Sequence, residues 1–200
     1  MIRYLLIAVI AYLLGSVSTG MTIAAIMNRN DLRTKGSKNI GATNVQRVLG
    51  NLPGILTLIG DGAKGFLACL IGHWILGESG AMVGGLFAVI GHNWPLYYGF
   101  KGGKGVACST GVYLFVNPTV LLFAAIAFLI SVLATGFVSL GSMVALAVTA
   151  VLMIVFHLSQ PLYWLWALIL FAMCVWRHRE NIRRLKDGTE HKFSFNRKKS

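Results

Sequence analysis

Charged residues are scarce in this 200-residue chain, and acidic residues are the scarcest. Asp and Glu contribute 6 residues against 18 Lys and Arg, all charged residues together make up 12% of the sequence, and 56% is hydrophobic. A soluble domain carries about twice that share of charge. These proportions exclude an ordinary soluble domain and predict an all-α, polytopic integral membrane protein, with residues 1–200 as a single membrane domain.

Cysteine is rare as well. Cys69, Cys108 and Cys174 all lie in apolar surroundings. None of them has the spacing of a CxxC motif or of a metal-ligand pair. We interpret them as small core residues and expect neither a disulfide nor a metal site.

Familiar catalytic motifs are missing too. No histidine is followed by Asp at HxxxxD spacing, and neither a GxSxG elbow nor an HExxH metal motif occurs. The polar segments are rich in cations instead, which give a formal net charge of +12. Nucleic acid is a conceivable partner for so basic a chain, but the apolar runs favour the lipid bilayer and phosphorylated substrates, and we expect no nucleic acid.

Seven apolar runs predict seven membrane-spanning helices. The expected helices cover residues 2–27, 53–76, 80–98, 105–116, 118–135, 138–157 and 161–178, and a basic cytoplasmic tail follows over 179–200. The first run resembles a signal peptide in its Arg3 and its small residues, but apolar character resumes over 21–27 and makes it long enough to span. The polar, basic end from Gly188 to Ser200 is expected to be mobile.

The fourth run, with about 12 residues, is short for a crossing that takes about 20. The cations nevertheless favour seven crossings. If segment 31–47 is cytoplasmic, then Lys101, Lys104 and the tail are all cytoplasmic only when the fourth run crosses. We expect the N-terminus outside and the C-terminus inside, so that three polar segments share one membrane face.

The first polar segment, Asp31 to Arg47, has the composition of an anion pocket. Small residues at Gly36, Gly41 and Ala42 permit close approach of a backbone. Its donors and cations, together with the arginine just before it, are Ser37, Asn39, Thr43, Asn44, Arg29, Arg33, Lys35, Lys38 and Arg47. Such a set suits phosphate. The alternative is a basic loop that only obeys the positive-inside rule, but the Gly-Ser and Gly-Ala-Thr-Asn groupings favour a site.

The second polar segment is Gly99-Phe-Lys-Gly-Gly-Lys-Gly105. Lys104 lies just before an expected helix N-terminus, where free N–H groups and the helix dipole favour an anion. The spacing is not that of a Walker A loop. The further residues expected to bind phosphate here are Lys101, Gly102, Gly103 and Gly105. The alternative is a flexible basic turn.

The third polar segment, 177–185, follows the seventh run. Its residues His178, Asn181 and Leu185 share one helical face, and Arg177 adds a cation. His178 can bind phosphate when it is protonated or accept a proton when it is neutral. The alternative is a basic collar that contacts lipid.

Other polar residues are expected to support these segments. Asp61 and Lys64 are one turn apart within the second run, and a charge at the bilayer centre costs about 3 kcal/mol, so the two are expected to pair. His92 is expected to support the glycine-rich segment. Glu180 is expected to pair with a nearby arginine (Arg177, Arg183 or Arg184), and Ser142 is expected to join the substrate site.

Three blocks together resemble one known family. They are Asp31-Leu-Arg with Gly36-Ser37 and Asn39-Ile-Gly-Ala-Thr-Asn44 to Arg47, then Gly91-His92 with Phe100-Lys-Gly-Gly-Lys-Gly-Val106, then Arg177-His178 with Glu180-Asn181 and Arg184-Leu185. Over essentially its whole length the chain is similar to the bacterial acyl-phosphate:glycerol-3-phosphate acyltransferase family, the PlsY family. One departure is Lys38, where the family commonly has glycine.

The resemblance implies a seven-helix enzyme of the bacterial inner membrane with its active site on the cytoplasmic face. Such an enzyme transfers a fatty acyl group from acyl phosphate to the sn-1 hydroxyl of glycerol 3-phosphate, giving lysophosphatidic acid and phosphate in phospholipid synthesis. It needs no acyl-CoA, metal or other cofactor, and we expect no obligate protein partner. The resemblance implies these catalytic residues: Ser37, Arg47, Lys104, His178 and Asn181.

Two questions stay open at this point. The general base is either His178 or a phosphate oxygen of a substrate. The alternative function is a membrane transporter for a phosphorylated solute, although polar groups gathered on one face rather than at the midplane favour the enzyme.

Overall fold

The computed structural model describes residues 1–29 and 32–193, so Asp31 and residues 194–200 of the predicted segments lie outside the described residues. These ranges are helical and contain no strand, which confirms the all-α class. The elements are α1 (Ile2–Ser16), α2 (Thr19–Ile26), α3 (Ala42–Leu49), α4 (Asn51–Asn93), the 3₁₀ turn η1 (Leu96–Tyr98), α5 (Val106–Val116), α6 (Pro118–Thr135), α7 (Val138–Phe156), α8 (Pro161–Arg177) and α9 (Arg179–Lys186).

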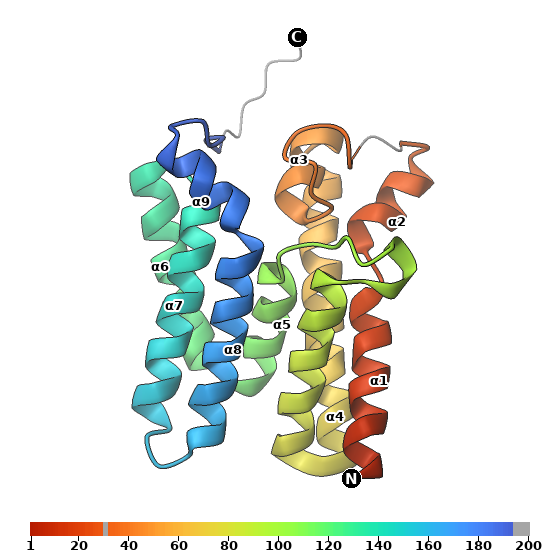
Figure 1. Ribbon diagram of the computed structural model, residues 1–200, viewed down its shortest axis with the longest axis vertical. Helices are drawn as coiled ribbons and strands as arrows, with labels where there is room; N and C mark the ends of the chain where they lie inside the picture. Colours follow the sequence, from red (N-terminus) through yellow and green to blue (C-terminus); the bar gives the residue numbers. More distant parts are fainter. Residues whose placement is uncertain (30–31, 194–200) are drawn as a thin grey trace. The chain divides into compact units, whose positions relative to one another are not determined.

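The chain divides into two compact units, Met1–Pro118 and Thr119–Ser200. The first unit contains α1 to α5, and the second contains nearly all of α6 and the helices α7 to α9 (Figure 1). The single membrane domain over residues 1–200 stays a prediction.

The first predicted helix, 2–27, is interrupted at Val17 and Ser18. Val17 has extended backbone, and the Ser18 hydroxyl caps α2 by accepting a hydrogen bond from the Met21 N–H at 3.3 Å. The break leaves the Val17 carbonyl outside the helical ladder, and Lys64 Nζ donates to it at 2.6 Å. The expectation of one continuous helix was wrong here, because a serine cap and a buried lysine stabilise the interruption.

Helix α4 is a helical hairpin (Figure 1). Its backbone leaves the helical region at Leu76 and Gly77, and the φ of Gly77 is 62°, a left-handed value that favours glycine. The two arms correspond to the predicted helices 53–76 and 80–98. The second arm ends at Asn93, before the 3₁₀ turn.

Small residues let α1 and α5 pack closely on the two arms of α4. A methyl group on Gly15 of α1 would collide with the Ala88 carbonyl, and one on Gly111 of α5 would collide with the Gly62 carbonyl. Close contacts through small residues are typical of helices that pack within membranes. This packing leaves the loop before α3 and the glycine-rich segment at the same end of the first unit (Figure 1).

Residues 42–49 form α3, a helix within the first polar segment that was not among the expected helices. Val45 of α3 is fully buried and packs in a small apolar cluster with Ala24 and Leu32. The helix ends at Gly50, whose φ is 103°. A two-turn helix packed on its apolar face therefore carries the second half of the predicted anion pocket.

In the second unit, a further helix follows α8. Residues 179–186 form α9, in agreement with the helical face expected for His178, Asn181 and Leu185. The Phe193 N–H donates to the Gly136 carbonyl at 2.8 Å, and Lys192 Nζ lies 5.9 Å from the centre of the Phe137 ring. Residues 188–193 therefore fold back onto the turn between α6 and α7. The mobility expected for the end of the chain stays a prediction, and residues 194–200 lie outside the described part.

Four helical stretches among the described residues are long and apolar enough to cross a bilayer, judged by length and composition. They are Ile2–Ile26, Asn51–Tyr98, Pro118–Thr135 and Val138–Phe156. The apolar helices α5 and α8 are shorter, with 11 and 17 residues. Seven crossings and their orientation stay predictions.

Candidate active site

Asn44 organises the first polar loop from a buried position at the start of α3. Its Nδ2 group donates to the carbonyls of Leu32 at 3.0 Å and Asn39 at 2.7 Å, with a longer bond to Lys35 at 3.3 Å. Its Oδ1 atom accepts from the Ser37 N–H at 2.7 Å. Hydrogen bonds inside the loop involve both polar atoms of the amide, which gives Asn44 a supporting role, and the expectation that it binds substrate stays a prediction.

Two left-handed residues flank Ser37 and shape its turn. The φ of Gly36 is 61° and that of Lys38 is 58°. A side chain at Gly36 would collide with Oδ1 of Asn44. At Lys38 the left-handed backbone costs roughly 1 kcal/mol for a residue with a Cβ, which is the physical reason why glycine suits this position.

Helix α3 presents two further predicted site residues. Thr43 and Arg47 are one turn apart and half-buried. The Asn39 side chain, which was also expected to bind substrate, uses Oδ1 to accept from the Gly41 N–H at 2.9 Å, just before the helix begins. The loop and α3 thus hold Ser37, Thr43 and Arg47 on one small scaffold.

The glycines of the Gly99–Gly105 segment pack against their own protein. The Gly103 N–H donates to the His92 carbonyl at 3.0 Å, and a methyl group on Gly103 would collide with the His92 ring. One on Gly102 would collide with Pro95 and with the His92 carbonyl, and both glycines are buried. Packing on the end of α4 therefore explains why these two residues are glycines, and the expectation that Gly102 and Gly103 bind phosphate stays a prediction.

Lys104 and Gly105 lead directly into α5. Lys104 is half-buried, whereas Lys101 is exposed on the preceding turn. Gly105 is the N-cap of α5 with a φ of 84° and no side-chain cap. The first turn of α5 thus presents N–H groups and the positive end of the helix dipole close to Lys104, an arrangement that suits an anion.

The predicted pairing of Asp61 and Lys64 is confirmed. Lys64 Nζ lies 3.0 Å from Asp61 Oδ1, and the side chains are 6% and 1% exposed. Asp61 also accepts a hydrogen bond from the Thr19 hydroxyl at 3.2 Å, and His92 Nδ1 lies 3.7 Å away. Since the His92 ring packs against Gly103, these contacts connect the buried ion pair to the glycine-rich segment.

Asn93 is a polar residue that sequence reasoning missed. It is the last residue of α4, fully buried, and neither polar atom of its side chain has a hydrogen-bond partner within residues 1–29 and 32–193. A methyl group on Gly105 would lie 3.0 Å from its Oδ1 atom. Its position directly after His92 was the signal that could have identified it.

In the second unit, His178 is buried at the junction of α8 and α9. Its Nδ1 atom lies 2.8 Å from the Cys174 carbonyl oxygen and 3.4 Å from the Cys174 sulfur. Because a carbonyl oxygen only accepts, Nδ1 carries the proton, and the neutral ring then has its lone pair on Nε2. This tautomer is the one that a general base acting through Nε2 requires.

Asn181 is held by a carboxylate that we did not predict. Its Nδ2 group donates to Glu190 Oε1 at 2.7 Å, and the Ser139 hydroxyl donates to the same oxygen at 2.9 Å. Arg184 Nε lies 2.7 Å from the other oxygen, Oε2. One carboxylate therefore fixes the orientation of the Asn181 amide and ties residues after α9 to α7.

The ionised form of Glu190 is favoured. Burial acts to raise the pKa of its carboxyl, but hydrogen bonds from Asn181, Arg184 and Ser139 outweigh burial and hold the pKa below its ordinary value. The signal in the sequence is weak, because Glu190 shares the basic tail over 179–200 with two other acids, Glu180 and Asp187.

Two other expectations for the second unit change. Arg184 pairs with Glu190, and Arg183 Nε lies 3.7 Å from Asp187 Oδ2, so two of the three arginines expected to pair with Glu180 pair elsewhere. Glu180 is exposed in the first turn of α9, and only Arg177, the last residue of α8, stays its expected partner.

The predicted ligand Ser142 is 4% exposed on α7. Its hydroxyl donates to the Val138 carbonyl at 2.8 Å within the same helix. The hydroxyl hydrogen is therefore used inside the helix, and Ser142 offers a ligand only its oxygen lone pairs.

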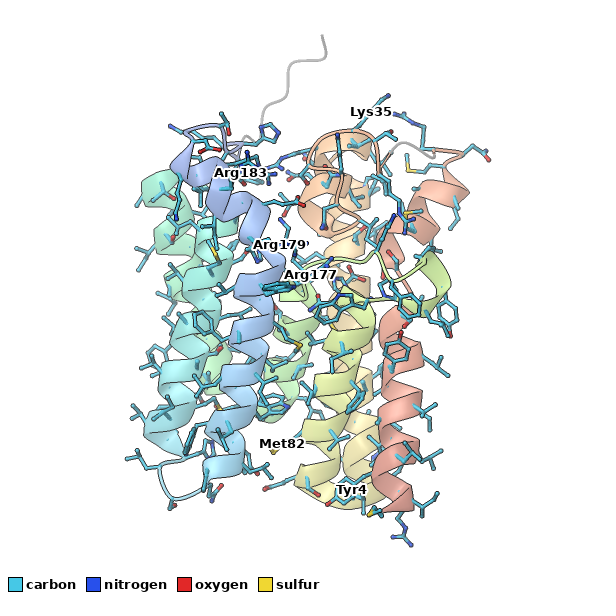
Figure 2. The ribbon with its side chains drawn as sticks, in the orientation of Figure 1. Tyr4, Lys35, Met82, Arg177, Arg179 and Arg183 are labelled. Atoms are coloured by element: carbon cyan, nitrogen blue, oxygen red, sulfur yellow. The ribbon has the colours of Figure 1, made fainter. Side chains whose placement is uncertain are left out.

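The structure gathers the predicted residues into two sets. The first unit holds Ser37, Asn39, Thr43, Asn44, Arg47, Asp61, Lys64, His92, Lys101, Gly102, Gly103, Lys104 and Gly105, and the second holds Ser142, Arg177, His178, Glu180 and Asn181. In Figure 2, Lys35 marks the loop end of the first unit, and Arg177, Arg179 and Arg183 mark the α8–α9 end of the second. That the two sets form one site stays a prediction.

Comparison with known proteins identifies relatives over almost the whole chain. The family model for glycerol-3-phosphate acyltransferase matches residues 5–188. A glycerol-3-phosphate acyltransferase of Clostridioides difficile (strain 630) is 44% identical over 195 residues, which cover 94% of this chain and 95% of the relative.

Two solved structures of PlsY (YgiH), an integral membrane glycerol 3-phosphate acyltransferase, are also similar, and each covers 96% of both chains. The glycerol 3-phosphate form is 40% identical with a TM-score of 0.89. The lysophosphatidic acid form is 38% identical with a TM-score of 0.86. The similarity thus extends through every element that carries a predicted site residue.

Proposed function

This chain belongs to the glycerol-3-phosphate acyltransferase family, and we propose that it transfers a fatty acyl group from acyl phosphate to the sn-1 hydroxyl of glycerol 3-phosphate. The hydroxyl oxygen bonds to the acyl carbonyl carbon as the bond from that carbon to the phosphate oxygen breaks. Lysophosphatidic acid and phosphate result. The observation that carries this proposal is the family match over residues 5–188, which includes all three polar segments.

The acceptor and the donor have different support. The solved relatives are described in glycerol 3-phosphate and lysophosphatidic acid forms, which supports this acceptor and this product. Acyl phosphate as the donor is supported by chemistry, because phosphate is a good leaving group and the chain lacks the motifs of a strong nucleophile. An enzyme with this donor mainly positions two anions and neutralises their charge.

Within this proposal, the first unit binds the phosphates. Arg47 offers a planar guanidinium that can bind two phosphate oxygens at once, and Ser37 and Lys104 add a hydroxyl and an ammonium group. Further contacts come from Thr43 and Lys101. Asn39, Asn44 and the glycines keep the loops in shape through hydrogen bonds and close packing within the first unit.

For the second unit, the proposal gives His178 and Asn181 roles in the reaction of the hydroxyl. A neutral His178 with its proton on Nδ1 can accept the hydroxyl proton at Nε2, and the contact from Cys174 supports this role. A phosphate oxygen of a substrate is the competing base. If the histidine is the base, a plot of log kcat against pH should fall linearly below a single apparent pKa. The absence of this fall in His178→Gln would favour the histidine.

We further propose one membrane domain with seven crossings, in the bacterial cytoplasmic membrane, with all three polar segments on the cytoplasmic face. The positive-inside rule supports this orientation. Single cysteines at Lys38 and Lys186, in a background without the three native cysteines, test it in intact cells. Both positions should be protected from an impermeant thiol reagent, and labelling of only one of them would exclude the seven-crossing topology.

The activity is tested with one purified preparation and labelled glycerol 3-phosphate. We expect turnover with acyl phosphate, none with acyl-CoA or acyl carrier protein, and no loss with a metal chelator. Arg47→Ala should remove most activity, whereas Arg3→Ala, at an exposed arginine of α1, should not. Turnover with acyl-CoA equal to that with acyl phosphate would overturn the proposed donor. A fully active Arg47→Ala variant would overturn the proposed site.

A further inference from the structure

Arg33 connects the first polar loop to the glycine-rich segment. Its Nη2 atom donates to the Tyr98 carbonyl at 3.0 Å and to the Lys101 carbonyl at 3.1 Å. Its guanidinium carbon also lies 5.9 Å from the centre of the Tyr98 ring, within the range of a cation–π contact. One nitrogen of the Arg33 guanidinium thus donates to two backbone carbonyls, and the expectation that its charge acts on an anion stays a prediction.

The two carbonyls converge because the backbone between them turns sharply. Gly99 has a φ of 64° and Phe100 a φ of 59°, both in the left-handed region. The Phe100 N–H donates back to the Pro95 carbonyl at 2.9 Å. The turn thus points the carbonyls of Tyr98 and Lys101 at one nitrogen atom, Nη2 of Arg33. This nitrogen carries two hydrogens in the fixed plane of the guanidinium and can donate one to each carbonyl.

Both ends of this connection are anchored. On one side, Leu32 precedes Arg33, is 1% exposed, and accepts a hydrogen bond from Asn44. On the other side, Gly103 is bonded to the end of α4 through the His92 carbonyl. Movement of the glycine-rich segment relative to the Asn44-organised loop therefore has to break the bonds of Arg33.

We propose that Arg33 is a positioning residue for acyl transfer, which fixes Lys104 relative to Ser37 and Arg47. This inference rests on the proposed function, in which those three residues bind phosphates. Ser37 lies four positions after Arg33, and Lys104 lies three positions after Lys101. A misplacement of about 1 Å between groups that position reactants can cost on the order of a hundredfold in rate.

The first experiment compares Arg33→Ala, Arg33→Lys and the control Arg3→Ala in steady-state kinetics. Arg33→Ala should lower kcat/KM with acyl phosphate and glycerol 3-phosphate by roughly tenfold to a hundredfold. Arg33→Lys keeps the charge but lacks the planar fork, so it should recover only part of this loss. The control should stay within about twofold of the wild type.

A second measurement distinguishes positioning from a general contribution to folding. In a double-mutant cycle, Arg33→Ala should cost much less when Lys104→Ala is already present, because a displaced lysine and an absent lysine have similar consequences. Additive losses would overturn the proposal, as would Arg33→Ala activity within twofold of the wild type. If Arg33→Ala does not fold, the same cycle is run with Arg33→Lys. Wild-type turnover in the same assay tests the proposed function separately.

Discussion

The two units order their polar ends by opposite chemistry. In the first unit, the neutral amide of Asn44 and the cation of Arg33 donate to backbone carbonyls. In the second unit, the carboxylate of Glu190 accepts from the side chains of Ser139, Asn181 and Arg184. The bonds of Asn44 and Arg33 involve no acid, whereas those of the second unit require an ionised carboxyl.

The largest expected effect tests the amide scaffold of the first unit. Asn44→Ala removes every hydrogen bond of that side chain and leaves buried backbone groups unpaired, at about 1–3 kcal/mol for each group. We expect loss of nearly all turnover and a clearly lower Tm of the purified protein. Asn39→Ala, which loses one side-chain bond to Gly41, should cost less in both measurements. A reversed order would show that Asn44 is not the organiser of the loop.

The next effect tests the carboxylate of the second unit. Glu190→Ala should reduce kcat at least tenfold, since hydrogen bonds to charged groups are worth about 1.5–3 kcal/mol. Glu190→Gln keeps the shape and one acceptor oxygen, so its loss should be intermediate. Kinetics and thermal unfolding of the two variants measure this, and unchanged kcat in Glu190→Ala would mean that Asn181 needs no such support.

A packing test on the first unit comes third. Gly103→Ala should raise the KM for glycerol 3-phosphate, because the methyl group collides with the His92 ring and displaces the segment that carries Lys104. Combining it with His92→Ala removes the collision and should restore part of the affinity relative to His92→Ala alone. If no rescue occurs, the methyl group blocks the substrate directly, as sequence reasoning had proposed.

A smaller effect is expected from acidic pH, which protonates Glu190 of the second unit. The pKa of Glu190 is depressed in the folded protein, so its stabilising contribution is fully present above the ordinary glutamate pKa of about 4.3 and is lost as the pH falls through the lower, folded value. The wild type should therefore lose stability below about pH 4.3. Glu190→Gln should lack this part of the acid response. Tm as a function of pH for both proteins measures the difference.

The smallest effect is expected at an exposed ion pair of the second unit. The side chains of Arg183 and Asp187 are 85% and 55% exposed. Arg183→Ala should therefore change the stability by less than about 1 kcal/mol. A large loss of activity in this variant would indicate that Arg183, and not only Glu190 with its partners, belongs to the functional end of the second unit.

Several features could be predicted because they depend on composition or on helical spacing. The low charge and the apolar runs require helices in an apolar environment, and Asp61 and Lys64 pair because they lie one turn apart. The three polar segments could be located in the same way, because their composition differs from that of the apolar runs. Interruptions such as Val17–Ser18 were missed, since a cap and a distant lysine stabilise them.

By itself the sequence determined that this protein is helical and apolar, which segments carry its cations, and to which family it belongs. Only the tertiary structure decided what the polar side chains do. Asn44 and Arg33 resemble phosphate ligands until the carbonyls that they reach are known, and Gly103 resembles a substrate contact until the His92 ring is placed beside it. The reason is that hydrogen bonds and close packing depend on which backbone groups converge, and residues far apart in the chain, such as Arg33 and Lys101, converge only through the fold.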